Sequence, residues 1–177
     1  MNLPNKLSVA RVLCIPAIVI LLHFPASACR IAAAVLFIIG CLTDFLDGRI
    51  ARKRNLVTDF GKFIDPVADK LLVLTTLIML VYSGKMPAWI VIVILCRELA
   101  VDGLRMVAVT KGQVIAAGPL GKWKTACQMI LISAILILNL GVFEAWPFTV
   151  LAAAVIALTL ISGVDYFVRN ASVLSEK

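Results

Sequence analysis

The feature that most constrains the fold of this chain is a set of six long apolar stretches separated by short connections. Hydrophobic residues make up 62% of the 177 residues, and the mean hydropathy of +1.06 is typical of a membrane protein. A helix needs about 20 predominantly apolar residues to cross a bilayer. The stretches that approach or exceed this length are Leu7–Phe24, Ala28–Ile50, Phe60–Tyr82, Ala88–Val109, Leu120–Leu140 and Ala145–Val168.

Membrane burial then restricts the fold class. Backbone N–H and C=O groups in hydrocarbon must be hydrogen-bonded within the protein, and helices achieve this within each segment. We therefore expect an all-α, polytopic membrane protein built as a bundle of six transmembrane helices. The connections are too short for a soluble module, so residues 1–177 are expected to form a single membrane domain.

The distribution of basic residues predicts the orientation of this bundle. Lysines and arginines concentrate at both ends and in the connections after the second and fourth stretches, whereas only Arg30 and Lys85 lie near the opposite connections. By the positive-inside rule, both termini face the cytoplasm of a multi-pass cell-membrane protein. The positive net charge of +7 is then expected mainly at the cytoplasmic surface, where it faces anionic lipid head groups. The sequence contains no nucleic-acid-binding motif, and we expect no nucleic acid partner.

The first apolar stretch also has some features of a cleavable signal peptide. It follows Lys6 and precedes small residues at positions 26–29 that resemble a cleavage site. Arg11 interrupts the apolar run, which favours a retained helix. The five cysteines are scattered without a Cys-x2-Cys pair, so they are expected to act as small apolar residues.

Four aspartates between the second and third stretches point to chemistry. Asp44 and Asp47 share a helix face at spacing i, i+3, and Asp65 and Asp69 share one at i, i+4. If the two helices are antiparallel neighbours, all four carboxylates can point into one space. Carboxylates that close need neutralising cations, and hard oxygen ligands suit Mg²⁺ or Mn²⁺. We therefore predict two divalent ions and metal-dependent phosphate chemistry at this site.

The acidic stretch has two other interpretations. An EF-hand loop requires ligands at alternate positions and a glutamate at its twelfth, and this stretch has neither. The aspartates could instead cap helices and pair with neighbouring basic residues. Carboxylates at membrane depth are expensive and usually functional, which favours the metal site.

The complete pattern is Asp-x2-Asp-Gly-x2-Ala-Arg-x8-Gly-x3-Asp-x3-Asp, from Asp44 to Asp69. It resembles the signature of the CDP-alcohol phosphatidyltransferase family without a gap or substitution. The resemblance implies a six-helix membrane bundle, often a homodimer, with an active site that opens to the cytoplasm. It also implies that Asp69, besides binding metal, takes the proton from the acceptor hydroxyl. The residues implied in binding the donor nucleotide are Gly48, Arg52 and Gly61.

Flanking segments narrow the resemblance within the family. The N-terminal residues up to Arg11, the segment CRELAVDGLR at 96–105 and the segment 121–125 resemble bacterial phosphatidylglycerophosphate synthases. This resemblance implies CDP-diacylglycerol as the donor, glycerol 3-phosphate as the acceptor, and membrane lipids as the surroundings. Another acceptor alcohol within the same family remains an alternative.

The fourth apolar stretch is unusual because charged residues lie well inside it. One charged residue at the bilayer centre costs ~2.5–3.5 kcal/mol on translocon scales, so four within nine residues predict a polar cavity. The acceptor phosphate needs cations of its own because the metals are occupied by the donor diphosphate. The candidates are Arg97, Arg105, Lys122 and Lys124. In the alternative interpretation, Arg105 pairs with Asp102 or Glu98 and the lysines bind lipid head groups.

Two more distant functions also use carboxylates in membranes. An intramembrane prenyltransferase holds Mg²⁺ and a diphosphate on aspartate clusters, but it would not explain the Ala-Arg and two-glycine spacing. A non-enzymatic cation transporter would place its site near the midplane, often in paired, broken halves. In this sequence the acids lie near the ends of their stretches and no second copy exists.

Overall fold

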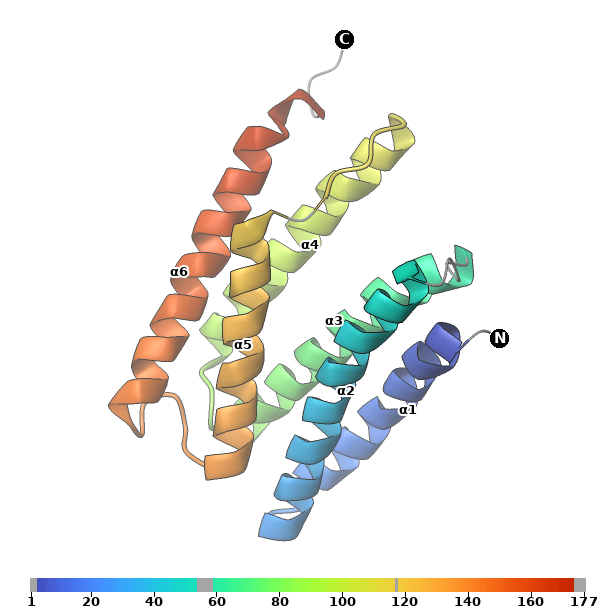
Figure 1. Ribbon diagram of the computed structural model, residues 1–177. Helices are drawn as coiled ribbons and strands as arrows, with labels where there is room; N and C mark the ends of the chain where they lie inside the picture. Colours follow the sequence, from blue (N-terminus) through green and yellow to red (C-terminus); the bar gives the residue numbers. More distant parts are fainter. Residues whose placement is uncertain (1–2, 54–58, 117, 174–177) are drawn as a thin grey trace. The chain divides into compact units, whose positions relative to one another are not determined.

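The computed structural model describes residues 3–53, 59–116 and 118–173 (Figure 1). Within these ranges, the side chains of residues 3–6, 44–53, 59–63, 65 and 66 are not described. The described chain is all helical and contains no strand, which confirms the predicted fold class. The helices are α1 (Leu3–His23), α2 (Ser27–Lys53), α3 (Asp59–Tyr82), α4 (Ala88–Thr110), α5 (Pro119–Leu138), α6 (Trp146–Arg169) and the short 3₁₀ helix η1 (Ala171–Val173).

The helices divide between two compact units. Unit 1 comprises residues 1–85 and 132–140, and unit 2 comprises residues 86–131 and 141–177. Helix α5 therefore contributes its first part to unit 2 and its last part to unit 1. Each unit is described separately below.

In unit 1, α1 packs against both α2 and α3, and α2 also contacts α3. Small residues on α2, Ala33 and Ala34, are completely buried beside Phe37. Small side chains let helix backbones approach closely, which drives packing in membranes where burial of apolar surface gives little gain. The α3 side of this core contains Leu72 and Leu77, both fully buried.

Two arginines join the helices of unit 1 through backbone carbonyls. Arg11 of α1 donates from Nε to the carbonyl oxygen of Gly40 on α2, at 3.2 Å. Arg30 near the start of α2 donates from Nε to the carbonyl oxygen of Leu136 on α5, at 3.0 Å. Each bond links segments far apart in sequence, so the arginines help to set which helices are neighbours.

Unit 2 is built on the packing of α4 against α6. The buried residues Val101, Leu104 and Ala108 of α4 form a cluster with Tyr166 of α6 and Val173 of η1. Lys111, just after α4, donates from Nζ to the carbonyl oxygen of Val173 at 2.8 Å. Packing and this hydrogen bond together hold the C-terminal turn against the end of α4.

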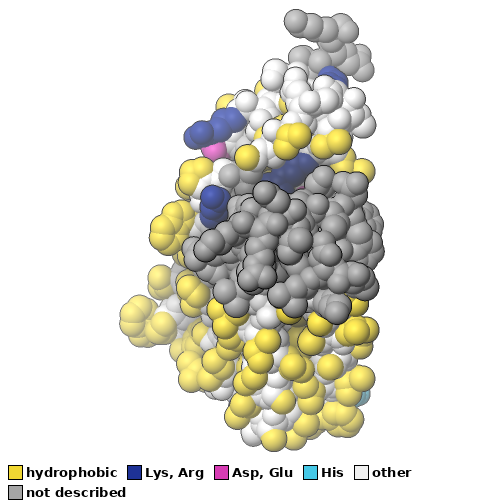
Figure 2. Space-filling view, turned by 45° about the vertical axis from the view of Figure 1, so that its right-hand side comes forward, with side chains coloured by type: hydrophobic (Ala, Val, Ile, Leu, Met, Phe, Trp, Pro, Cys, Tyr) yellow, Lys and Arg dark blue, Asp and Glu magenta, His cyan; other side chains and the backbone are white. Residues whose placement is uncertain are grey.

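Large apolar side chains lie exposed on every one of the six α-helices. Figure 2 shows hydrophobic side chains over much of the coloured surface. Exposed apolar surface of this extent marks a site of association with membrane or protein, and helices with such surfaces suit a lipid environment. One example from each helix, in chain order, is Ile20, Ile39, Ile78, Ile92, Ile130 and Leu160.

Within the described residues, two helices are long and apolar enough to cross a membrane, Pro119–Leu138 and Trp146–Arg169. Two shorter apolar segments, Leu7–His23 and Ser27–Thr43, belong to α1 and α2. All six expected helical stretches coincide with helices. The crossing of all six, and the side on which the termini lie, stay predictions.

Candidate active site

The backbone positions of the four motif aspartates lie on two helices that contact each other. Asp44 and Asp47 belong to α2, and Asp65 and Asp69 belong to α3. The side chains of Asp44, Asp47, Asp65 and Arg52 lie outside the described residues, as do the side-chain surroundings of Gly48 and Gly61. Their convergence on one metal site therefore stays a prediction.

A contact about one helical turn from the motif shows which faces of α2 and α3 pack against each other. A Cβ added to Gly40 would lie 2.7 Å from Cδ2 of Leu72, so α3 packs directly against the bare backbone at this point. On a regular helix, position 40 shares a face with positions 44 and 47, and position 72 shares a face with 65 and 69. The helix faces that carry the aspartate positions are thus the faces that meet at Gly40 and Leu72.

Of the four aspartates, Asp69 has a described side chain. It is half-buried, and its Oδ1 atom is shielded from solvent. The described residues contain no group of three side chains that could hold a metal ion. The donor set of the motif, four carboxylates on two packed helices, has the chemistry that Mg²⁺ or Mn²⁺ requires.

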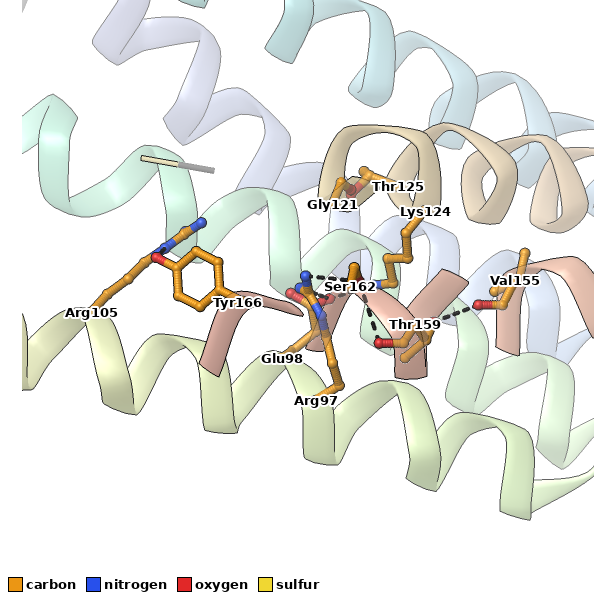
Figure 3. A network of polar contacts seen from close by, with 10 residues as sticks. All are labelled: Arg97, Glu98, Arg105, Gly121, Lys124, Thr125, Val155, Thr159, Ser162 and Tyr166. Carbon is orange, nitrogen blue, oxygen red and sulfur yellow. Dashed lines mark hydrogen bonds and ion pairs between the residues drawn. The ribbon is translucent and has the colours of Figure 1, made fainter. Parts of the chain in front are cut away.

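A second polar cluster joins α4, α5 and α6 (Figure 3). Glu98 accepts a hydrogen bond from Nη1 of Arg97 at 3.2 Å, and it forms an ion pair with Lys124 of α5. Nη2 of Arg97 donates to Oγ of Ser162 on α6, at 3.2 Å. Lys124 is only 2% exposed, and the ion pair with Glu98 helps to compensate its charge, because an isolated buried ion is very costly.

Arg105 lies further along α4 and has a different partner. Its Nε donates to the Tyr166 hydroxyl at 3.0 Å, and its guanidinium carbon lies 5.4 Å from the centre of that ring. Both contacts hold the guanidinium over the aromatic face. Figure 3 draws this pair apart from the Glu98 cluster.

The four predicted acceptor-binding residues are therefore only partly brought together. Arg97 and Lys124 share Glu98, Arg105 is held by Tyr166, and the side chain of Lys122 is exposed. Tyr166 is a partner for Arg105 that the sequence interpretation did not name. Whether these residues bind the acceptor phosphate stays a prediction.

The structure also reveals polar residues on α6 that the sequence interpretation missed. Ser162 binds Arg97, and a Cβ added to Gly163 would lie 3.2 Å from Cγ of Arg97, so that glycine makes room for the arginine. Thr159, Ser162, Gly163 and Tyr166 follow the spacing i, i+3, i+4, i+7 of one helix face. This stripe of small and polar residues in a largely apolar helix is the sequence pattern from which a polar contact face on α6 could have been predicted.

Comparison with known proteins defines the class of this fold and site. A family model described as CDP-alcohol phosphatidyltransferase matches residues 1–165. The chain belongs to the CDP-alcohol phosphatidyltransferase family, as the aspartate motif predicted.

Individual relatives match over most of their length. A CDP-diacylglycerol–glycerol-3-phosphate 3-phosphatidyltransferase of Bacillus subtilis is 48% identical, covering 96% of this chain and 95% of the relative. A probable phosphatidylglycerophosphate synthase of Mycobacterium tuberculosis is 39% identical, covering 95% and 81%. A CDP-diacylglycerol–glycerol-3-phosphate 3-phosphatidyltransferase of Rickettsia bellii is 37% identical, covering 94% and 93%. Two of these relatives are named for the donor CDP-diacylglycerol and the acceptor glycerol 3-phosphate, and the third for the product phosphatidylglycerophosphate.

Proposed function

We propose that this protein transfers the phosphatidyl group of CDP-diacylglycerol to sn-glycerol 3-phosphate, giving phosphatidylglycerophosphate and CMP. The observation that carries this proposal is the 48% identity over 96% of the chain to a relative named for this reaction. The intact aspartate motif supports it, because all eight motif positions are present at the expected spacing. Neither the prenyltransferase nor the transporter interpretation has comparable support.

The four aspartates are proposed to hold two divalent ions, Mg²⁺ or Mn²⁺. Such ions, when bound, neutralise the donor diphosphate and orient it for in-line displacement. The chain's own residues would then complete the site: Gly48 and Gly61 leave room for the cytidine nucleotide, and Arg52 pairs with its phosphate charge.

Asp69 is the proposed general base of the transfer. The acceptor hydroxyl oxygen would attack the phosphatidyl phosphorus as its proton passes to the Asp69 carboxylate. The bond between that phosphorus and the bridging oxygen breaks, and CMP leaves with the bond's electron pair. The half-buried environment of Asp69 in α3 suits a base that is shielded from bulk water but reachable by substrate.

The acceptor phosphate is proposed to bind near the basic residues of α4 and α5. Two cations, Arg97 and Lys124, contact the carboxylate of Glu98, which brings basic charge together in this cluster. Nε of Arg97 is buried without a hydrogen-bond acceptor among the described residues, and buried polar groups usually have partners. Arg105 and the exposed Lys122 would add further charge for a dianionic phosphate.

We further propose that the chain is a multi-pass cell-membrane protein with six spans, cytoplasmic termini and a site reached from the cytoplasm. The exposed apolar residues on all six helices support the membrane spans. The asymmetry of basic residues supports the orientation. A homodimer embedded among membrane lipids is the assembly that we expect from the family resemblance.

The activity can be tested with purified protein in detergent micelles. We expect radiolabelled glycerol 3-phosphate to enter a chloroform-soluble product only when CDP-diacylglycerol and Mg²⁺ or Mn²⁺ are present, with CMP released in equal amount. Parallel reactions with labelled serine or inositol test other acceptors. Transfer to one of these, without transfer to glycerol 3-phosphate, would keep the family but refute the proposed acceptor.

A further inference from the structure

Arg11 is a charged side chain in the core of unit 1. It is 2% exposed, and it lies within α1 among fully buried residues such as Ile18. Removing a guanidinium from water is costly unless hydrogen bonds and nearby charges compensate. Its position within a largely apolar helix therefore calls for a specific role.

The described contact of Arg11 is with the turn of α2 that leads into the metal-binding motif. Its Nε donates to the carbonyl oxygen of Gly40 at 3.2 Å, and Oγ1 of Thr43 donates to the same oxygen at 2.8 Å. In an α-helix this carbonyl is also the acceptor for the N–H of the residue four positions later, which is Asp44. Arg11 thus binds the peptide group on which the Asp44 backbone is anchored.

The same point is where α1, α2 and α3 meet. A Cβ added to Gly40 would lie 2.7 Å from Leu72 of α3 and 3.8 Å from Cγ of Arg11. Asp69 precedes Leu72 by three residues, which is ~4.5 Å along the helix, and Asp44 follows Gly40 by four residues, which is ~6 Å. The level at which Arg11 meets α2 and α3 is therefore about one helical turn from one aspartate position on each helix, Asp44 and Asp69.

We infer that Arg11 is a positioning residue for the metal-binding aspartates. Its planar guanidinium fixes the α2 turn before Asp44 against α1, at the point where Leu72 fixes α3. Partners that orient metal ligands typically change metal affinity or activity by about 10- to 100-fold when they are altered. This inference rests on the proposed metal site.

The test compares Mn²⁺ binding, measured by electron paramagnetic resonance, in the wild type, Arg11→Lys and Arg11→Met. We expect both variants to raise the Mn²⁺ dissociation constant about tenfold. Lysine keeps the buried charge but loses the planar fork, so Arg11→Lys isolates geometry. Loss of a neighbouring positive charge would by itself strengthen cation binding, so weaker binding by Arg11→Met also indicates positioning.

Arg30→Met is the matched control, because Arg30 makes the same kind of bond to a backbone carbonyl in the same unit. We expect Arg30→Met to leave the Mn²⁺ dissociation constant within about twofold of the wild type, whatever its melting temperature. Excess Mg²⁺ should restore turnover in Arg11→Lys, which a merely unfolded variant would not show.

Three outcomes would overturn the inference. Mn²⁺ binding within twofold of wild type in both Arg11 variants refutes positioning while leaving the metal site intact. Equal weakening in Arg30→Met would show a general effect on packing. If the wild type bound no Mn²⁺, or if Asp69→Asn bound it as tightly as the wild type, the proposed metal site itself would fail.

Discussion

Among single residues, Arg105 is a proposed ligand of the acceptor phosphate whose contacts the structure describes. Its guanidinium is already oriented by the Tyr166 hydroxyl and ring, and a preoriented cation loses less freedom when it binds phosphate. The contact with Tyr166 is therefore compatible with a binding role, because it stabilises the guanidinium without neutralising its charge.

We predict that Arg105→Ala raises the KM for glycerol 3-phosphate by about 10- to 100-fold, the effect of losing a contact between charged groups. The KM for CDP-diacylglycerol should change much less. Tyr166→Phe removes the hydroxyl acceptor and keeps the ring, so its effect on the acceptor KM should be smaller. Steady-state kinetics with each substrate varied in turn provide the measurement, and an unchanged acceptor KM in Arg105→Ala would move the phosphate pocket elsewhere.

Replacing Gly40 is expected to change the stability of the packing between α2 and α3. Alanine in place of glycine gains up to ~1 kcal/mol of helix propensity, but the new methyl group would overlap with Leu72, whose side chain is fully buried. Overpacking of a core costs typically ~1–3 kcal/mol. We therefore expect Gly40→Ala to lower the melting temperature in detergent.

Leu72→Ala supplies the matching test of this contact. The double variant Gly40→Ala, Leu72→Ala should be more stable than the sum of the two single effects predicts, because the overlap is removed. Additive effects in the double-mutant cycle, or a Gly40→Ala variant more stable than the wild type, would show that α2 and α3 do not meet as described.

At the scale of helices, Glu98 joins α4 to α5, and Arg97 joins α4 to α6. The exposed fractions of the Glu98 and Lys124 side chains are 17% and 3%. Removing one partner of such a pair leaves an uncompensated buried charge, which is more destabilising than replacing the whole pair. The carboxylate therefore helps to stabilise two basic side chains between these helices.

We predict that Glu98→Gln destabilises the protein by ~3–5 kcal/mol, the effect of breaking a buried pair. Asp165→Asn is the control, because Asp165 pairs with Arg169 at 2.7 Å on the surface, where the arginine is 69% exposed. An exposed pair contributes ~0–1 kcal/mol. Thermal unfolding of both variants in the same detergent measures the difference, and equal small shifts would refute the proposed importance of the Glu98 cluster.

At the scale of the whole molecule, the orientation in the membrane decides which solution reaches the aspartate motif. Gln113, between α4 and α5, and Ser83, between α3 and α4, both lie exposed in connections. The positive-inside rule assigns these two connections to opposite sides of the membrane.

We predict that an impermeant maleimide labels Gln113→Cys in inside-out vesicles and Ser83→Cys in right-side-out vesicles, in a protein whose five cysteines are first replaced by serine. Permeabilised vesicles should label both, which controls for reactivity. The reverse pattern would invert the topology and place the motif on the outer side.

Residue type and spacing were sufficient to predict the helical class, the approximate helix positions and the family. Apolar length and helical periodicity are local properties, so six helices could be located from residue type alone. The spacing from Asp44 to Asp69 is also local, which is why the motif could be recognised without coordinates.

The polar side chains that meet could not be predicted from residue type and spacing. The bonds from Arg11 to Gly40, from Lys124 to Glu98 and from Arg105 to Tyr166 join residues 29, 26 and 61 positions apart. Such pairings depend on the faces with which helices pack, and a basic residue within an apolar helix can satisfy its charge with several different neighbours. The sequence therefore showed that buried charges needed partners, whereas helix packing selected Gly40, Glu98 and Tyr166.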